Sequence, residues 1–329
     1  MRATVVGAGV MGLATARELA KRGHEVDVHE QFDLLHTRGS SHGTSRIFRL
    51  SYPEERWIQL AQRAYALWRE IEAESGRRLL ELSGLVDVDV DPTERLRAFA
   101  ACGVAYEELS AEDVRQRFGF AYDDVPRLVF TADAGISLAA ESVRTFADEA
   151  ARFGARIHER SRVDRLDDVD ADVVVVTAGG WAPTLLRTAE IELEAQPTRE
   201  TIVYFRLRDD HVFPSLIDEL GERQFFALAA PGVGVKAGLH HSGAPTDPER
   251  EEEPDLGVVA AVSEWVARRL PRVDPSALHA ETCIYTNTAD LHFVCERRGR
   301  IVVGSACSGH GFKFAPAVGE RLADLAETG

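Results

Sequence analysis

The first thirty residues show two hydrophobic periodicities in succession. Apolar residues at 3–6 predict a short strand, apolar positions with helical spacing from 10 to 21 predict a helix, and alternation at 25–29 predicts a second strand. Gly7, Gly9 and Gly12 lie between the first strand and the helix in GxGxxG spacing, and Glu30 ends the second strand. This order of elements predicts a βαβ unit that binds a dinucleotide.

Each residue of this pattern has its own physical role. Gly7 allows the tight turn, Gly9 lets the backbone approach a pyrophosphate, and Gly12 lets the helix pack closely on the strand. The helix N-terminus faces the diphosphate with free N–H groups and the positive end of its dipole. The carboxylate of Glu30 would bind the ribose hydroxyls and repel a 2′-phosphate, so NAD or FAD fits and NADP does not. A glycine-rich turn that binds nothing is the alternative.

Similar α/β patterns recur in the middle and at the end of the chain. Residues 155–183 predict a strand, an acidic turn and a valine strand that is buried on both faces, and residues 301–327 predict a strand, a glycine-rich loop and a helix. Residues 82–130 and 196–290 instead show the alternation of an antiparallel sheet. We therefore predict an α/β fold. A Rossmann-like domain comprises residues 1–81, 131–195 and 291–329, interleaved with an antiparallel-sheet substrate domain of residues 82–130 and 196–290.

Composition narrows the class of protein. The 329 residues can bury a large core, and a net charge of −16 argues against a nucleic-acid or anionic-membrane partner. No leader and no membrane-spanning stretch is expected, which predicts a cytoplasmic protein. The four cysteines form no CxxC pair, so no metal site and no disulfide framework is expected. The acidic run at 244–255 is expected to be a solvated loop.

The glycine-rich loop at residues 304–313 distinguishes between the two dinucleotides. It directs a second helix N-terminus toward the middle of the protein. A positive dipole end suits the pyrimidine edge of an isoalloxazine, which becomes anionic on two-electron reduction. FAD is therefore favoured, and NAD is the alternative.

Four ordered motifs carry a resemblance to a known family. They are GSSHGTSRIFRL at 39–50, VKAGLHH at 235–241, CIYTNTADLHFV at 283–294 and SGHGFKF at 308–314. In this order and spacing the chain resembles, over nearly its whole length, the monomeric sarcosine oxidase and N-methyltryptophan oxidase family of D-amino-acid-oxidase-like flavoproteins. The resemblance implies FAD, a monomer, and oxidation of an amino acid with a secondary amine while O2 is reduced to hydrogen peroxide.

The resemblance also assigns residues to the substrate carboxylate. Arg49 and Lys313 would hold it, with Arg46 near the flavin. An arginine fork binds a carboxylate through two parallel hydrogen bonds, and a lysine adds a second positive charge. By residue type alone, surface ion pairs in an acidic protein explain these cations equally well.

Further roles follow from the same resemblance. Lys236 lies among small apolar residues, where a buried ammonium is costly without a partner or a task, and the matching family lysine promotes electron transfer to O2 near flavin N5. His240 matches an active-site histidine, Tyr285 lines the substrate cavity, and Cys283 forms a thioether to the flavin 8α carbon. By residue type alone, Lys236 could reach water at a strand end, His240 could be structural, and Cys283 could be a small buried hydrophobe.

The remaining expected FAD contacts come from both glycine-rich loops and the segments beside them. Loop capping is an alternative for His42. The full expected set is Gly7, Gly9, Val10, Met11, Gly12, Glu30, Gln31, Ser41, His42, Thr44, Arg46, Val163, Ala178, Gly179, Trp181, Cys283, Gly309, His310, Gly311, Phe312 and Lys313.

The chain also departs from the family pattern. Phe225 and Phe226 stand where the family has a tyrosine upstream of the lysine, Cys307 replaces an aromatic residue before SGHG, and the family continues beyond the position of Gly329. Sarcosine, other N-methyl amino acids, pipecolate and proline all fit the carboxylate clamp. A hydride equivalent would pass to flavin N5 and leave an imine. An FAD- or NAD-dependent amino acid dehydrogenase with another acceptor and a noncatalytic dinucleotide-binding relative are the alternatives.

Overall fold

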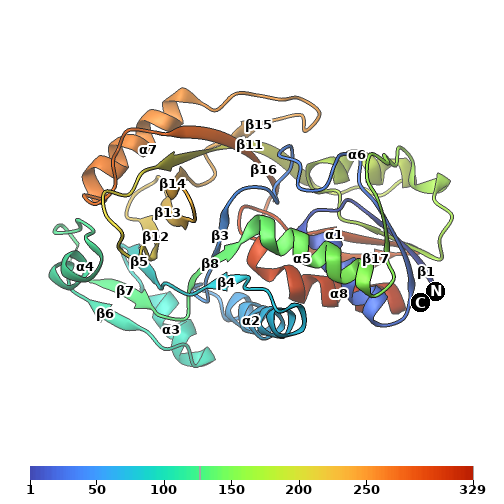
Figure 1. The fold of residues 1–329 in the computed structure, drawn as a ribbon, viewed down its shortest axis with the longest axis horizontal. Helices are drawn as coiled ribbons and strands as arrows, with labels where there is room; N and C mark the ends of the chain where they lie inside the picture. The colour runs from blue at the N-terminus through green and yellow to red at the C-terminus, as the bar shows by residue number, and fades with distance from the viewer. Residues whose placement is uncertain (126, 329) are drawn as a thin grey trace.

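A computed structural model describes residues 1–125 and 127–328, and its first sheet is assembled from separated parts of the chain (Figure 1). Among the described residues this sheet has six strands. Their order is β17 (Val294–Arg298), β18 (Ile301–Ser305), β10 (Val173–Val176), β1 (Arg2–Val6), β2 (Glu25–His29) and β9 (Arg156–His158). All neighbours are parallel except β17 and β18, which form a hairpin.

The valine strand β10 is central and fully buried, as its sequence predicted. Val173 and Val175 face one hydrophobic cluster, and Val174 and Val176 face another on the opposite side of the sheet. Helices α1 (Val10–Lys21), α5 (Ala139–Arg152) and α8 (Ala315–Glu327) cover the first side. Helix α6 (Ala182–Leu186) and the short turns η1 (Leu166–Asp168), η2 (Gly179–Trp181) and η3 (Arg187–Ala189) cover the second. A strand between two apolar layers needs no polar face.

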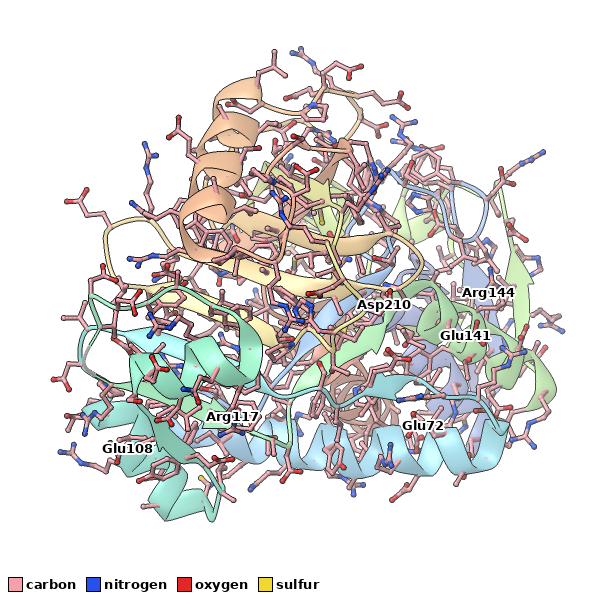
Figure 2. The ribbon with its side chains drawn as sticks, turned by 60° about the vertical axis from the view of Figure 1, so that its left-hand side comes forward. Glu72, Glu108, Arg117, Glu141, Arg144 and Asp210 are labelled. Atoms are coloured by element: carbon pink, nitrogen blue, oxygen red, sulfur yellow. The ribbon has the colours of Figure 1, made fainter. Side chains whose placement is uncertain are left out.

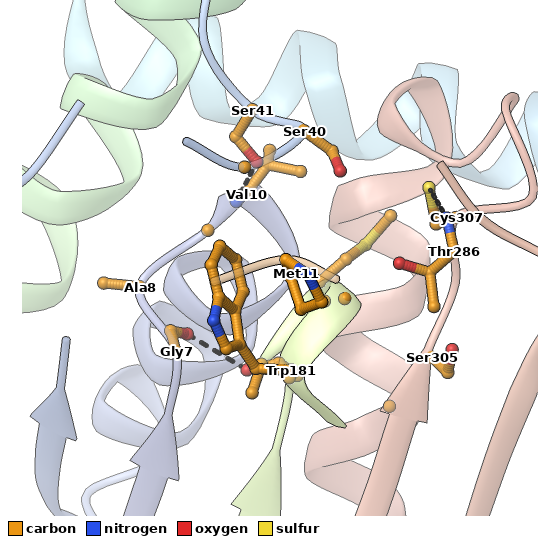
Figure 3. A pocket seen from close by; sticks show the side chains of 18 of the residues that line it. Gly7, Ala8, Val10, Met11, Ser40, Ser41, Trp181, Thr286, Ser305 and Cys307 are labelled. Carbon is orange, nitrogen blue, oxygen red and sulfur yellow. Dashed lines mark hydrogen bonds between the residues drawn. The ribbon is translucent and has the colours of Figure 1, made fainter. Parts of the chain in front are cut away.

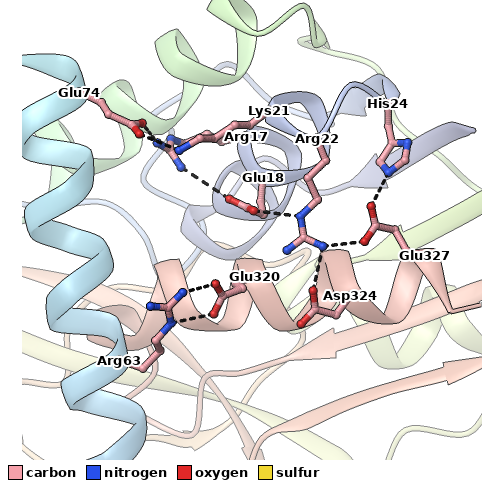
Figure 4. Close-up of polar contacts among 10 residues, drawn as sticks. All are labelled: Arg17, Glu18, Lys21, Arg22, His24, Arg63, Glu74, Glu320, Asp324 and Glu327. Carbon is pink, nitrogen blue, oxygen red and sulfur yellow. Dashed lines mark hydrogen bonds and ion pairs between the residues drawn. The ribbon is translucent and has the colours of Figure 1, made fainter.

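Helix α2 (Glu55–Ser75) packs beside α8, and ion pairs link these two helices to α1 (Figure 4). Arg22 contacts Asp324 and Glu327 at 2.8 Å each, and Arg63 pairs with Glu320. Exposed pairs of this kind contribute little one by one. Together they fix the C-terminal helix α8, which follows the second glycine-rich loop, relative to α1, which follows the first glycine-rich loop.

The second sheet carries the other long strands of the chain. In the described ranges it has nine strands, in the order β15 (Ala244–Pro245), β11 (Ala195–Phe205), β14 (Gly234–Leu239), β13 (Phe225–Ala230), β12 (Ser215–Glu219), β5 (Leu85–Asp89), β7 (Leu128–Thr131) and β6 (Glu107–Leu109), with β16 (His279–Thr288) paired to β11. Helices α3 (Thr93–Cys102), α4 (Ala111–Phe118) and α7 (Leu256–Arg269) pack around it (Figure 1).

The expectation of a purely antiparallel second sheet is wrong at one pair. Strands β5 and β12 are parallel, whereas their neighbours are antiparallel. These two strands come from the two separate segments that build the sheet, so no hairpin connects them and no turn fixes their direction.

A small third sheet lies between the two large ones. It contains β3 (Ser45–Phe48), β8 (Gly135–Leu138) and β4 (Leu80–Glu81). The Ser45 hydroxyl donates to Ala229 O on β13 at 2.6 Å, and the Ser215 hydroxyl donates to Gly135 O at 2.9 Å. The segment that follows β3 is thereby held between the two large sheets. The division into two domains stays a prediction.

Charged side chains stand out from the outer helices (Figure 2). Glu141 and Arg144 on α5 form one of the ion pairs, at 3.3 Å, and Arg117 pairs with Glu107 at 2.6 Å. None of the described helices combines the length and the apolar character that crossing a membrane requires.

Candidate active site

A cavity of about 660 Å³ runs past the carboxyl ends of β1, β10 and β18 and reaches β16 of the second sheet. The carboxyl ends of parallel strands are where ligands bind in open α/β sheets. The cavity is lined by every residue predicted to contact FAD except Gly12, His42 and Thr44. Among the predicted catalytic residues, Lys313 and Tyr285 line the cavity, and those that do not line it are Arg49, Lys236 and His240.

The first glycine-rich loop borders the cavity, and its tight path requires residues without a Cβ (Figure 3). Gly7 has a φ of +100°, and a Cβ there would lie 2.7 Å from Thr177 O. A Cβ on Gly12 would lie 1.9 Å from Gly7 O. The Val10 N–H at the start of α1 donates to the Ser41 hydroxyl at 3.0 Å, beside the cavity. This helix N-terminus therefore faces the space that a diphosphate requires.

Glu30 is fixed in place at the end of β2. Its Oε2 accepts from Ala8 N–H at 2.8 Å, and its Oε1 accepts from Phe32 N–H at 3.0 Å. The carboxylate is buried and lines the cavity. The loop, the helix N-terminus and this carboxylate together fit the diphosphate and ribose of a dinucleotide.

The acidic run is a loop, as predicted, but part of it lines the cavity. Asp247, Pro248 and Glu249 are cavity residues. Arg162 contacts the Glu249 carboxylate at 2.8 Å, and Arg38 donates to Glu249 O at 2.8 Å. Sequence reasoning missed these contacts. The one available signal was the pair of arginines in other loops, whose charge complements the acidic run.

Two cations lie beside Tyr52 at the opposite end of the cavity, where Lys313 lines it and Arg49 does not. Lys313, on the turn η4 (Phe312–Phe314), is 1% exposed, and its Nζ donates to His310 O at 2.7 Å and to the Tyr52 hydroxyl at 3.0 Å. The Arg49 guanidinium carbon lies 4.4 Å from the centre of the Tyr52 ring. Burial, together with the charge of Arg49, holds the pKa of Lys313 well below its usual range.

Neither of these cations has an acidic partner among the described residues. Lys313 hydrogen-bonds only to neutral oxygens, and the Arg49 Nε is buried without a hydrogen bond. Lys313 is buried and Arg49 is half-buried, and neither directly contacts a carboxylate among the described residues. This arrangement favours an anionic ligand, because a carboxylate in direct contact would offset the cost of enclosing the two charges. Tyr52 was missed by sequence reasoning, since a tyrosine three residues after an arginine carries no signal of its own.

Lys236 on β14 lies behind the cavity wall, next to Arg46 and Cys283. It is 3% exposed, and its Nζ and the Arg46 Nη1 both donate to Ser45 O. Burial first, and then the charge of Arg46, hold the pKa of Lys236 well below its usual range. The alternative of a lysine that reaches water at a strand end is therefore wrong, since this side chain is enclosed.

Cys283 on β16 lines the cavity, and its thiol is buried. Burial raises the pKa of this thiol, and the nearby Arg46, whose Nη2 lies 3.9 Å from the sulfur, lowers it. His42 is enclosed nearby with neither ring nitrogen hydrogen-bonded, and burial lowers its pKa to about 4. A loop-capping role for His42 is not supported, because capping would require a hydrogen bond from the ring.

His240 and Tyr285 form one wall of the site together with Gly309. The His240 Nδ1 lies 3.3 Å from the Tyr285 hydroxyl, and burial holds the pKa of His240 well below its usual range. A Cβ on Gly309 would come within 2.6 Å of the Tyr285 ring and 2.7 Å of the His240 ring. Phe226 lies near His240 with ring centres 6.5 Å apart, whereas Phe225 stacks on a tryptophan of α7, so only Phe226 faces this site.

Lysine usage was a further signal that sequence reasoning did not use. The chain has 38 lysines and arginines, and only Lys21, Lys236 and Lys313 are lysines. Two of the three are buried at this site. The chain uses arginine for nearly all its other basic positions. Lysine differs from arginine in having a compact ammonium group whose pKa shifts readily on burial, and both enclosed basic residues of this site are lysines.

The fold and the cavity define a dinucleotide-dependent oxidoreductase with a second sheet on its substrate side. The chain belongs to the FAD dependent oxidoreductase family, whose family model (DAO) matches residues 2–325. FAD is accordingly the cofactor, and the resemblance seen in the four motifs is confirmed.

Individual relatives cover nearly the whole chain. The peroxisomal sarcosine oxidase of Homo sapiens is 32% identical, covering 98% of this chain and 91% of its own. The monomeric sarcosine oxidase of Streptomyces avermitilis is 32% identical, covering 99% and 93%. Among solved structures, NikD, described as an unusual amino acid oxidase essential for nikkomycin biosynthesis, has a TM-score of 0.89 and 26% identity, covering 99% of this chain and 93% of its own.

Proposed function

We propose that the protein oxidises an amino acid that carries a secondary amine, such as sarcosine, another N-methyl amino acid, pipecolate or proline, and passes the electrons to O2 to give hydrogen peroxide. The observation that supports this most directly is the pair formed by the buried Lys313 and the half-buried Arg49, neither of which forms an ion pair with a carboxylate in the described part of the chain. The names of the sarcosine oxidase relatives support the same substrate class. We further propose that the protein acts as a monomer.

The side chains of the site suit this reaction. FAD, when bound, supplies the acceptor for the hydride equivalent that leaves the carbon beside the nitrogen, and the substrate becomes an imine. Arg49 and Lys313 bind the carboxylate and favour the neutral amine, because they add positive charge to the site. His240 is neutral at physiological pH, since its pKa is lowered, and with Tyr285 it can contact the amine without adding a further charge.

The substrate class is tested by anaerobic mixing. Sarcosine, N-methylalanine, proline and pipecolate are added to the oxygen-free protein, and the visible flavin absorbance is followed. At least one should bleach it within seconds to minutes, and the matching amino acid amide, which lacks the carboxylate, should do so at least about 100-fold more slowly, because charge-assisted bonds are lost. Admitting air should restore the colour and release peroxide. Equal rates with acid and amide would contradict the carboxylate clamp, and colour recovery without peroxide would contradict the oxidase assignment.

We also propose that FAD is bound covalently through Cys283. The thiol lines the cavity, and although burial raises its pKa, Arg46 beside it acts in the direction of the thiolate needed to form a thioether. Acid precipitation of the purified protein should give a yellow pellet, and Cys283→Ala should move the colour to the supernatant. Cys102→Ala, which changes a thiol outside the cavity, is the matched control and should leave the pellet yellow. A colourless wild-type pellet over a yellow supernatant would exclude the thioether while keeping FAD.

A further inference from the structure

The segment between β3 and α2 carries two residues of the carboxylate site and has little backbone support. Residues 49–53 follow the last strand residue, Phe48, and precede the first turn of α2. Within the described residues no backbone-to-backbone hydrogen bond involves them. The positions of Arg49 and Tyr52 therefore depend on side-chain contacts. Tyr52 has one such contact in Lys313, and Ser51 has another in Arg95 of α3.

Arg95 joins this segment to the second sheet. Its side chain is 4% exposed and donates to four acceptors. The Nη1 atom donates to the Ser51 hydroxyl at 2.9 Å and to Asp87 Oδ1 at 3.0 Å, and the Nη2 atom donates to Asp89 Oδ2 at 3.1 Å and to Glu219 Oε2 at 2.6 Å. One guanidinium thus fixes β5, β12 and Ser51 relative to one another, with the geometry that its rigid fork imposes.

The charges of this cluster also bear on Arg49. Three carboxyl groups surround the single charge of Arg95, and burial raises the pKa of one of them, Asp87. The Asp87 Oδ2 atom is buried without a hydrogen bond. Burial has the largest effect on the pKa of Asp87 and raises it. The charges of Arg95 and then Arg49 lower it, so Arg49 lies close enough to interact with this carboxyl group. The ionised form of Asp87 therefore offsets part of the cost of keeping the half-buried Arg49 charged.

We propose that Arg95 is a positioning residue for carboxylate binding, which acts through Ser51 to hold Arg49 and Tyr52 where they meet the substrate anion. This inference rests on the proposed function, because it assigns a purpose to the clamp that Arg49 and Lys313 form. The four hydrogen bonds of Arg95 all go to protein acceptors, so its guanidinium is engaged within the fold. Its effect is on the affinity for a carboxylate rather than on the reaction that follows binding.

Ser51→Ala tests the proposal with the smallest change. Removing Arg95 itself would leave the buried Asp87 and the half-buried Asp89 and Glu219 without their shared partner and could unfold the protein. Ser51→Ala removes only the hydroxyl that Arg95 contacts. Ser142→Ala is the matched control, because Ser142 is also fully buried but bonds only to Leu138 O at the start of its own helix. The probe is acetate, which has a carboxylate and no amine, and its dissociation constant is measured from the change in the flavin spectrum.

In Ser51→Ala the dissociation constant for acetate should rise about tenfold, as expected for the loss of one buried charge-assisted hydrogen bond. The KM of the best amino acid substrate should rise in parallel, with kcat changed less than about twofold. Ser142→Ala should bind acetate as the wild type does. Ser51→Thr, which keeps the hydroxyl, should restore most of the affinity. In an Arg49→Gln background the further change Ser51→Ala should weaken binding less than it does in the wild type, because part of its effect is exerted through Arg49.

Each of the other outcomes would contradict the positioning role of Arg95, the carboxylate clamp, or both. If the wild type binds acetate and Ser51→Ala binds it equally well, or if the effects of Ser51→Ala and Arg49→Gln are independent, the positioning role is wrong and the proposed function stands. If the wild type shows no carboxylate binding at all, the clamp and the positioning role are both wrong.

Discussion

Replacing Lys236 with methionine is expected to slow the reaction of the reduced protein with O2 by about two to three orders of magnitude, while flavin reduction by substrate changes less than about threefold. The physical reason is the loss of a buried ammonium near charge that develops as O2 accepts electrons. Methionine keeps the length of the side chain and removes only its charge and its bond to Ser45 O. Stopped-flow absorbance measures the two half-reactions separately.

The pH profile gives the same prediction a second readout. Burial and Arg46 lower the pKa of Lys236, so the charged form exists below that pKa and is lost as the pH rises through it. The wild-type rate with O2 should therefore fall with rising pH before ordinary lysines titrate, and the Lys236→Met rate should lack this fall. Lys21→Met, a change in a surface lysine paired with Glu74, is the control and should leave both half-reactions intact. Equal slowing of the two half-reactions would remove Lys236 from the oxygen step.

The nucleotide end of the site could be predicted from the sequence because its signals are local. Gly7, Gly12 and Glu30 lie within one βαβ unit, and the collisions that a Cβ would cause there involve neighbouring turns of chain. The valine run of β10 was also a local signal. A strand between two apolar layers must be apolar at every position, so four successive valines predicted a central buried strand. Periodicity therefore determined both the elements and their contacts.

The substrate end could be predicted only residue by residue, through resemblance. Arg49, Lys313 and His240 meet because a small third sheet, a turn and the end of β14 come together from distant parts of the chain. No spacing in the sequence encodes such a meeting. Tyr52 and Arg95 went unnoticed for the same reason, since each gains its meaning from a partner far along the chain.

Contacts between distant segments explain two features that the local pattern did not predict. The acidic run at 244–255 has the composition of a solvated loop, yet Arg38 and Arg162 hold part of it against the cavity. The β5 and β12 strands show ordinary alternation, yet their direction depends on how two separate segments assemble. In both cases the local pattern described the element correctly and said nothing about its neighbour.

Lys313→Met is expected to weaken acetate binding by about two orders of magnitude at neutral pH, because one charge-assisted bond is lost and the remaining cation must bind the anion alone. The larger consequence concerns pH. Burial and Arg49 lower the pKa of free Lys313, and a bound carboxylate would raise it again, so binding takes up a proton whenever the pH lies between the two values.

Acetate affinity in the wild type should therefore decrease as the pH rises above the lowered pKa, by up to about tenfold per pH unit. Other titratable groups face Lys313: burial first, and then Lys313, lower the pKa of His310 to about 3, burial lowers that of His240, and burial raises that of Tyr52. Spectral titration with acetate across the pH range, in wild type and Lys313→Met, measures this dependence. A pH-independent wild type, or a pH dependence that survives in Lys313→Met, would show that Lys313 does not carry the proton coupled to carboxylate binding.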